Sequence, residues 1–219
     1  MQHLKRSILL SLVLGAIVLL NIPFSVFAED DTYTSTSNVY RFADASEVDD
    51  AWSTLTRFES GVKMTFHTAD LPANDVVTAW WVVFNAPENC TDNACGEDDI
   101  FVYEDGELFI GENGPELNLD QIEAAEIALL GATGNVVNEN GEGHFSAWLT
   151  LGESPSIVFG PGLTKPMSAE IHIVLRTHGQ MDEELLDEQI IDINGGCAAE
   201  FPNAPCQDLQ FSMHKPPME

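Results

Sequence analysis

The sequence predicts a mainly β fold, an antiparallel β-sandwich or barrel-like domain with one or two short helices. Many short segments alternate apolar and polar residues, one run is apolar on both phases, and the connections are rich in Gly, Pro, Asn and Asp. No repeat or linker divides the chain. We therefore expect a flexible N-terminal segment over 29–38 and a single β-rich domain over 39–219.

The N-terminus has the features of a cleavable export signal. Lys5 and Arg6 precede a long uncharged apolar run, and the sequence VFA ends at Ala28. We expect a signal peptide over 1–28, cleaved after Ala28, and a protein that is secreted or periplasmic. An uncleaved membrane anchor is the less favoured alternative, because Pro23 lies close to the end of the apolar run.

The composition is strongly acidic, and this limits the classes of partner. The chain has 36 Asp and Glu against 8 Lys and Arg, a net charge of −28, which becomes −30 without the two basic residues of the signal segment. Such a charge repels nucleic acid and anionic membranes, and no basic patch offsets it. We expect no nucleic-acid binding and no stable membrane anchor after cleavage, and the sequence does not identify an extracellular ligand or protein partner.

Four cysteines form two local pairs in a chain that is expected to reach an oxidising compartment. Three connectivities are possible, and we favour Cys90–Cys95 with Cys197–Cys206 because each pair closes a short loop rich in Asn, Asp, Gly or Pro. A zinc site made by all four thiolates is the alternative. Neither pair has the C-x2-C spacing that is common in such sites.

Two segments give the clearest strand signals. In GVKMTFH, Gly61–His67, apolar residues alternate with polar ones, which predicts a half-buried strand. The run VVTAWWVVFN, Val76–Asn85, is apolar on both phases and predicts a central strand covered on both faces. Further strands are expected over Val39–Phe42, Ile100–Tyr103, Leu108–Ile110, Val136–Val137, His144–Leu151, Ile157–Phe159, Glu170–Arg176 and Leu209–His214.

Two segments predict helices instead. NLDQIEAAEIALLG has Asn118 as a candidate N-cap, a glutamine three residues later and Gly131 at its end, so we expect a helix over Leu119–Leu130. A second short helix is expected over Asp182–Ile190, where acidic residues crowd the first turn.

The histidines are candidate copper or zinc ligands. A regular strand rises about 3.4 Å per residue, so His172 and His178 lie roughly 20 Å apart and cannot bind one ion. A shared site requires His67, His172 and His214 to meet across neighbouring strands. The alternative interpretation is that these side chains, and His144 with them, are hydrogen-bonded in the fold or solvated.

The same late strand suggests a possible polar surface site at Arg176 and His178. We expect Ile171 and its apolar neighbours to anchor the core and Arg176 to pair with Glu170 or another acid.

Calcium is a second candidate cofactor. Asn138, Asn140 and Glu142 alternate around a glycine, and the loop CTDNACGEDD, 90–99, also concentrates oxygen donors. Neither loop has EF-hand spacing. In so acidic a chain, such clusters also arise by chance.

No motif identifies an enzyme. A G-x-S-x-G motif and phosphate-binding loops are absent from the sequence, and disulfide-bonded cysteines cannot act as nucleophiles. A glycosidase-like carboxylate pair remains open. We therefore favour a non-catalytic extracytoplasmic binding or structural module, with a metal-binding protein second and a hydrolase-type enzyme third.

Three blocks carry a resemblance to a group of uncharacterised secreted bacterial proteins: TADLPANDVVTAWWVVFNAPENC, AEIHIVLRTHGQ, and the closing DEQI, GGC and CQDLQFSMH. The resemblance covers about residues 40–214 and implies export and the extent of the domain, but no catalytic residue. The late strand AEIHIVLRTHGQ also resembles, more weakly, CHRD-type β-sandwich modules, although it lacks the glycine expected before the acid. This second resemblance implies only a β-sandwich fold.

Overall fold

The computed structural model describes residues 32–111, 114–152, 154–197 and 206–218, so the expected signal peptide lies outside the described residues. The strands of the main sheet are β1 (Tyr33–Arg41), β2 (Glu47–Phe58), β3 (Gly61–Thr68), β4 (Asp75–Phe84), β9 (Ile127–Val136), β10 (Gly143–Thr150), β11 (Ile157–Phe159), β12 (Glu170–Gln180) and β13 (Gln207–His214). The other elements are the strand pairs β5 (Tyr103–Glu104) with β6 (Glu107–Leu108) and β7 (Ile110–Gly111) with β8 (Gly114–Pro115), the helices α1 (Leu119–Ala124) and α2 (Leu186–Ile191), and three 3-10 turns, η1 (Pro87–Asn89), η2 (Thr91–Asn93) and η3 (Glu97–Asp99).

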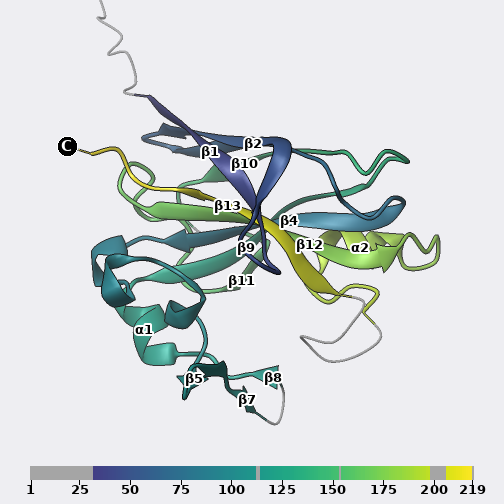
Figure 1. The fold of residues 1–219 in the computed structure, drawn as a ribbon. Coiled ribbons are helices and arrows are strands. Elements are labelled where there is room, and N and C mark those ends of the chain that lie inside the picture. Colours follow the sequence, from purple (N-terminus) through teal and green to yellow (C-terminus); the bar gives the residue numbers. More distant parts are fainter. Residues whose placement is uncertain (1–31, 112–113, 153, 198–205, 219) are drawn as a thin grey trace, which may run out of the picture.

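The nine main strands form one antiparallel sheet in the order β10-β3-β2-β1-β13-β12-β4-β9-β11. The sheet curls strongly into a half-barrel (Figure 1). The curl brings β9 against β10, where the Asn135 side chain donates a hydrogen bond of 2.9 Å to the carbonyl of His144. The predicted mainly β, barrel-like fold with two short helices is confirmed.

Strand β4 confirms the prediction of a central strand covered on both faces. It pairs with β12 on one side and β9 on the other, and all ten of its residues are buried. Trp81 and Val83 pack into the main core inside the curl. Val82 and Phe84, on the opposite face, belong to a second and smaller core.

The second core lies between the outer face of the sheet and residues 87–111 and 114–124, which we call the cover. The cover contains the three 3-10 turns, the two short strand pairs and α1, and Figure 1 shows it below and to the left of the sheet. Ile100 and Ile122 of the cover pack near Phe84 and Ile127 of the sheet. The disulfide Cys90–Cys95 lies in the cover.

The second disulfide, Cys197–Cys206, closes the loop between α2 and β13. Both disulfides have the local pairing that the sequence favours. Within the described ranges, no helix has the length and apolar character needed to cross a membrane.

The helix predicted over Leu119–Leu130 is shorter in the structure. Asn118 caps α1 as expected, since its side-chain oxygen accepts a hydrogen bond from the backbone N–H of Gln121, but the helix ends at Ala124. Glu126 then adopts a positive φ of 50°, and the chain continues as β9 beside β4. Pairing with a buried strand outweighs the helical pattern of the sequence at this point.

The other helix and the N-terminal segment also differ from the sequence prediction. Helix α2 begins at Leu186, four residues later than expected, and ends at Ile191. Strand β1 begins at Tyr33, so the part of 29–38 from Tyr33 onward is paired with β2 instead of flexible. Strand β2 itself was not predicted.

Candidate functional site

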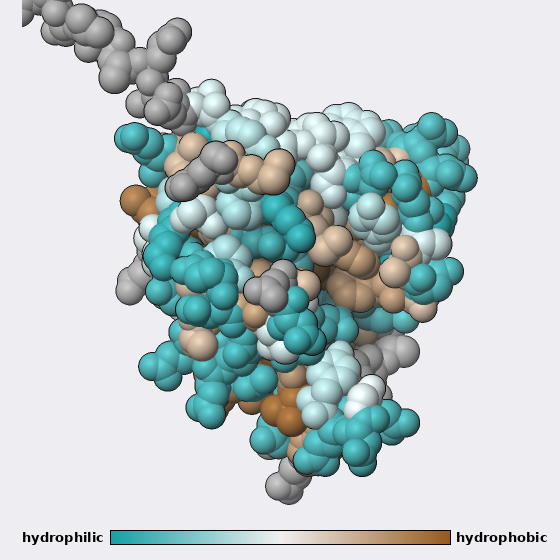
Figure 2. Space-filling view, turned by 60° about the vertical axis from the view of Figure 1, so that its left-hand side comes forward, coloured by the Kyte–Doolittle hydropathy of each residue, from teal (hydrophilic) through white to brown (hydrophobic). Residues whose placement is uncertain are grey.

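A cleft of about 450 Å³ lies on the outer face of the sheet, beside the cover. Its floor comes from β4, β9, β12 and β13, and its wall comes from residues 95–103 of the cover. The lining is mostly apolar and aromatic, including Trp80, Phe84, Phe159 and Phe211. Figure 2 shows brown hydrophobic surface interrupting the teal hydrophilic surface on this side of the molecule.

The register of three adjacent strands builds the floor. His172 of β12 lies opposite Val82 of β4 and opposite Met213 of β13. Two residues further along β12, Val174 lies opposite Trp80 on the same face. The face of β12 that carries His172, Val174 and Arg176 is therefore largely buried.

A buried hydrogen bond holds His172 in the floor. Its Nε2 lies 2.8 Å from Oε1 of Glu170, and both side chains are buried. The imidazole packs against Phe84 with ring centroids 5.0 Å apart. When the imidazole is neutral and donates from Nε2 to this carboxylate, Nδ1 is its acceptor nitrogen. In the described part of the chain, Nδ1 has no hydrogen-bond partner.

The lining of the cleft also contains charged side chains, some of which are hydrogen-bonded to neighbouring groups. Arg176 is buried and donates from Nη1 to Asp208 at 2.8 Å and from Nε to the carbonyl of Ile193 at 2.9 Å. The hydroxyl of Tyr103 donates to Glu97 at 3.2 Å. Desolvation raises the pKa of Glu97 above its ordinary value, with the Tyr103 hydrogen bond opposing this effect.

The acids in the lining outnumber the bases. Glu97, Asp98 and Asp208 all border the cleft, and the charges of Asp208 and Asp98 also contribute to the raised pKa of Glu97. Among the described lining residues, Arg176 is the one arginine or lysine. The cleft therefore combines apolar walls with an excess of negative charge.

The structure does not bring His67, His172 and His214 together. Along β13, Met213 and His214 point to opposite faces, so His214 enters the main core while His172 lies in the cleft. His67 lies on β3, where it contacts His144 of β10. The cross-strand metal site proposed from the sequence has no geometric basis with these three ligands.

His214 is held between two serines inside the curl. Its Nδ1 lies 2.9 Å from the Ser35 hydroxyl and its Nε2 lies 2.8 Å from the Ser53 hydroxyl. Burial lowers the pKa of His214 to about 4, and the positive charge of Arg57 adds to the effect. A serine bonded to an imidazole is the arrangement of a serine nucleophile, but Ser53 is 0% exposed and substrate cannot reach it.

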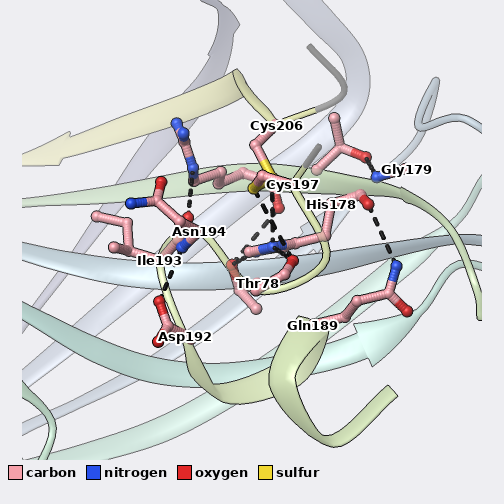
Figure 3. Close-up of a disulfide and its surroundings, with 12 residues drawn as sticks. Thr78, His178, Gly179, Gln189, Asp192, Ile193, Asn194, Cys197 and Cys206 are labelled. Atoms are coloured by element: carbon pink, nitrogen blue, oxygen red, sulfur yellow. Dashed lines mark hydrogen bonds between the residues drawn. A yellow bond between two sulfur atoms is a disulfide. The ribbon is translucent and has the colours of Figure 1, made fainter. Parts of the chain in front are cut away.

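His178 lies beneath the second disulfide, as Figure 3 shows. Its Nδ1 donates to the carbonyl of Gly195 at 2.8 Å, so its Nε2 accepts from the hydroxyl of Thr78, also at 2.8 Å. The indole N–H of Trp80 donates to that hydroxyl at 2.6 Å. Burial lowers the pKa of His178, so this chain of hydrogen bonds holds a neutral imidazole.

Arg176 and His178 therefore do not form the polar surface site considered from the sequence, because they are only 2% and 1% exposed. The loop that ends in the Cys197–Cys206 disulfide covers this end of β12. The sequence predicted that Arg176 pairs with Glu170 or with another acid. In the structure Arg176 pairs with Asp208, and Glu170 contacts His172 instead.

The described residues contain one cluster of three or more His, Cys, Asp or Glu with metal-binding spacing, formed by His178, Cys197 and Cys206. The two sulfurs are joined in a disulfide, so they are not thiolate ligands. This cluster has a structural role.

The calcium candidates make hydrogen bonds within their own loops. The side-chain oxygen of Asn138 accepts from the backbone N–H groups of Asn140 and Glu142, at 2.9 and 3.0 Å. In the loop over 90–99, Asp99 accepts from the backbone of Thr91 and Gly96. These oxygens shape their turns, and among the described residues neither loop holds three or more His, Cys, Asp or Glu at metal-binding spacing.

Comparison of the chain with known protein families, with curated proteins and with solved structures finds no match. The cleft could not be predicted from the sequence because its wall comes from the cover, whose position against β12 and β13 has no local sequence signal.

Proposed function

We propose that this protein is an extracytoplasmic binding protein that takes one small, mainly apolar ligand into the cleft between the cover and the sheet. The two disulfides indicate an oxidising compartment outside the cytoplasm. The observation that carries the proposal is the cleft itself, which has the size of a small-molecule site and aromatic walls with few polar groups.

The polar side chains of the cleft determine which end group a ligand can carry. The acceptor nitrogen of His172 can receive a hydrogen bond from a ligand, while the guanidinium of Arg176 is already paired with Asp208. Because three carboxylates border the cleft, an anionic end group would be repelled. The ligand that fits best has an aromatic or aliphatic body and an uncharged or cationic hydrogen-bond donor.

A neutral fluorescent probe such as N-phenyl-1-naphthylamine tests the proposal. We expect saturable binding at one site, with a rise in the thermal unfolding midpoint because the ligand binds the folded state. Met213 lines the cleft and is 37% exposed, so Met213→Trp should fill part of the site and weaken binding at least tenfold.

Met181→Trp is the matched control, because Met181 is 43% exposed and does not line the cleft. It should bind the probe as the unaltered protein does. Equal probe affinity in both variants, or no saturable binding at all, would contradict the proposal.

A further inference from the structure

His67 and His144 form a close pair on the outside of the sheet, and neither residue lines the cleft. They lie directly opposite each other on β3 and the edge strand β10. Their Nδ1 atoms are 3.1 Å apart, and their rings stack with centroids 4.3 Å apart and an interplanar angle of 25°. His144 is exposed and His67 is half-buried, so solvent reaches the pair.

This separation matches the requirement of a metal ion with two imidazole ligands. With metal–nitrogen distances of about 2.0–2.1 Å, two nitrogens lie about 2.9 Å apart at a right angle and about 3.3 Å apart at a tetrahedral angle. The strand register makes the two residues cross-strand neighbours. Because the rings are stacked, metal binding requires the two side chains to rotate so that both lone pairs point at one ion.

We propose that His67 and His144 form a two-histidine site for a divalent transition-metal ion, with Cu²⁺ as the preferred ion and water in its remaining positions. Cu²⁺ binds nitrogen ligands more tightly than the other divalent ions of the first transition series. The net charge of −28 raises the local concentration of cations at the surface. No third His, Cys, Asp or Glu of the described chain completes a three-ligand cluster with this pair, so the site is open on the solvent side.

Trp52 gives the site its own optical reporter. It lies opposite His67 on β2, and the two rings have centroids 5.8 Å apart. The row Trp52, His67 and His144 therefore crosses three adjacent strands. Bound Cu²⁺ is paramagnetic and quenches a nearby indole, so occupancy should be visible as loss of Trp52 fluorescence.

The test is a titration of the purified protein with Cu²⁺ alone, followed by tryptophan fluorescence and by electron paramagnetic resonance. The protein is purified without residues 1–28, the expected signal peptide, so that His3 does not supply a separate copper site. We expect one tightly bound ion with a resonance signature of two nitrogen ligands. His67→Gln and His144→Gln should each weaken binding at least tenfold, and the double variant should lose the nitrogen signature.

Two tryptophan variants separate binding from its readout. Trp52→Phe should lose most of the quenching and keep the resonance signal, whereas Trp148→Phe, which removes another exposed tryptophan, should keep both. Unchanged copper affinity in the His67 and His144 double variant, or a signal with oxygen ligands only, would overturn the proposal and leave the pair as a hydrogen bond between two imidazoles. The cleft takes no part in this test, so the two proposals succeed or fail independently.

Discussion

Glu170 and His172, two residues apart on β12, are joined by a hydrogen bond of 2.8 Å, and His172 lies in the floor of the cleft. Both side chains are buried, so loss of the carboxylate would leave the Nε2–H of His172 without its acceptor. An unsatisfied buried donor costs about 1–3 kcal/mol. We expect Glu170→Ala to lower the free energy of unfolding by that amount in urea denaturation, and Glu170→Gln, which keeps an acceptor oxygen, to lower it less. Equal losses in the two variants would show that this hydrogen bond does not determine the effect.

Arg57 is a buried cation on β2 that links this strand to β13 and to the segment that precedes β12. It is 0% exposed and donates to the carbonyls of Pro166 and His214, at 2.7 and 2.9 Å. Burial lowers its pKa to about 10, so it is charged at neutral pH.

We therefore expect Arg57→Ala to remove the hydrogen bonds that Arg57 donates to these two buried carbonyls, at a cost of about 1–3 kcal/mol for each carbonyl that is left unsatisfied. Urea denaturation measures the total. Arg57→Lys, which keeps the charge and some donors, should be less destabilised. A stable Arg57→Ala protein would contradict this role.

His214 should make stability depend on pH. Its pKa is lowered to about 4 in the fold from an ordinary value of 6.5, so the unfolded chain binds more protons between these values. Its stabilising contribution is fully present above about pH 6.5 and is lost as the pH falls toward 4, by about 3 kcal/mol in total. Urea denaturation at a series of pH values measures the slope.

In His214→Gln that component of the slope should disappear, although the variant is less stable at neutral pH. Comparison of the two proteins cancels the other titrating groups, including His178, whose pKa is also lowered. Parallel pH profiles for the two proteins would rule out His214 as the source.

The charge of the cleft should select among ligands of one shape. Three acids, Glu97, Asp98 and Asp208, border the cleft, whereas Arg176 is the one arginine or lysine among its described lining residues. We therefore expect 2-naphthylmethylammonium to bind more tightly than 2-naphthoate at neutral pH. A preference on the order of tenfold corresponds to about 1.4 kcal/mol. Isothermal titration of both compounds measures it. The double variant Glu97→Gln, Asp98→Asn should reduce the preference, and tighter binding of the naphthoate would refute the charge argument.

The sequence predicted the fold best where one element carried an unambiguous pattern. Strand β4 is apolar on both phases, and it is indeed the buried centre of the sheet. Strand β2 escaped prediction because its inward positions include Ser53 and Arg57, which hydrogen bond inside the curl and disguise the alternation. The helical pattern before Gly131 was misleading because pairing with β4 decides the conformation from Ile127 onward.

The candidate site was less predictable than the fold. The sequence identifies His172 and Arg176 on one strand, but only the packing of the cover turns their face into a cleft. Likewise, the pairing of His67 with His144 depends on the register between β3 and β10, which no local pattern specifies.

Strands β1 and β13, from opposite ends of the described chain, are neighbours in the middle of the sheet, where Tyr40 lies opposite Phe211. Contacts between such distant segments form slowly, because the loop that joins them must close first. During synthesis or export, β12 has no partner on its β13 side and β1 has only β2 until the last segment arrives. Completion of the sheet is therefore a late event that requires nearly the whole chain, and a chain cut short before β13 would leave two unpaired strand edges open to aggregation.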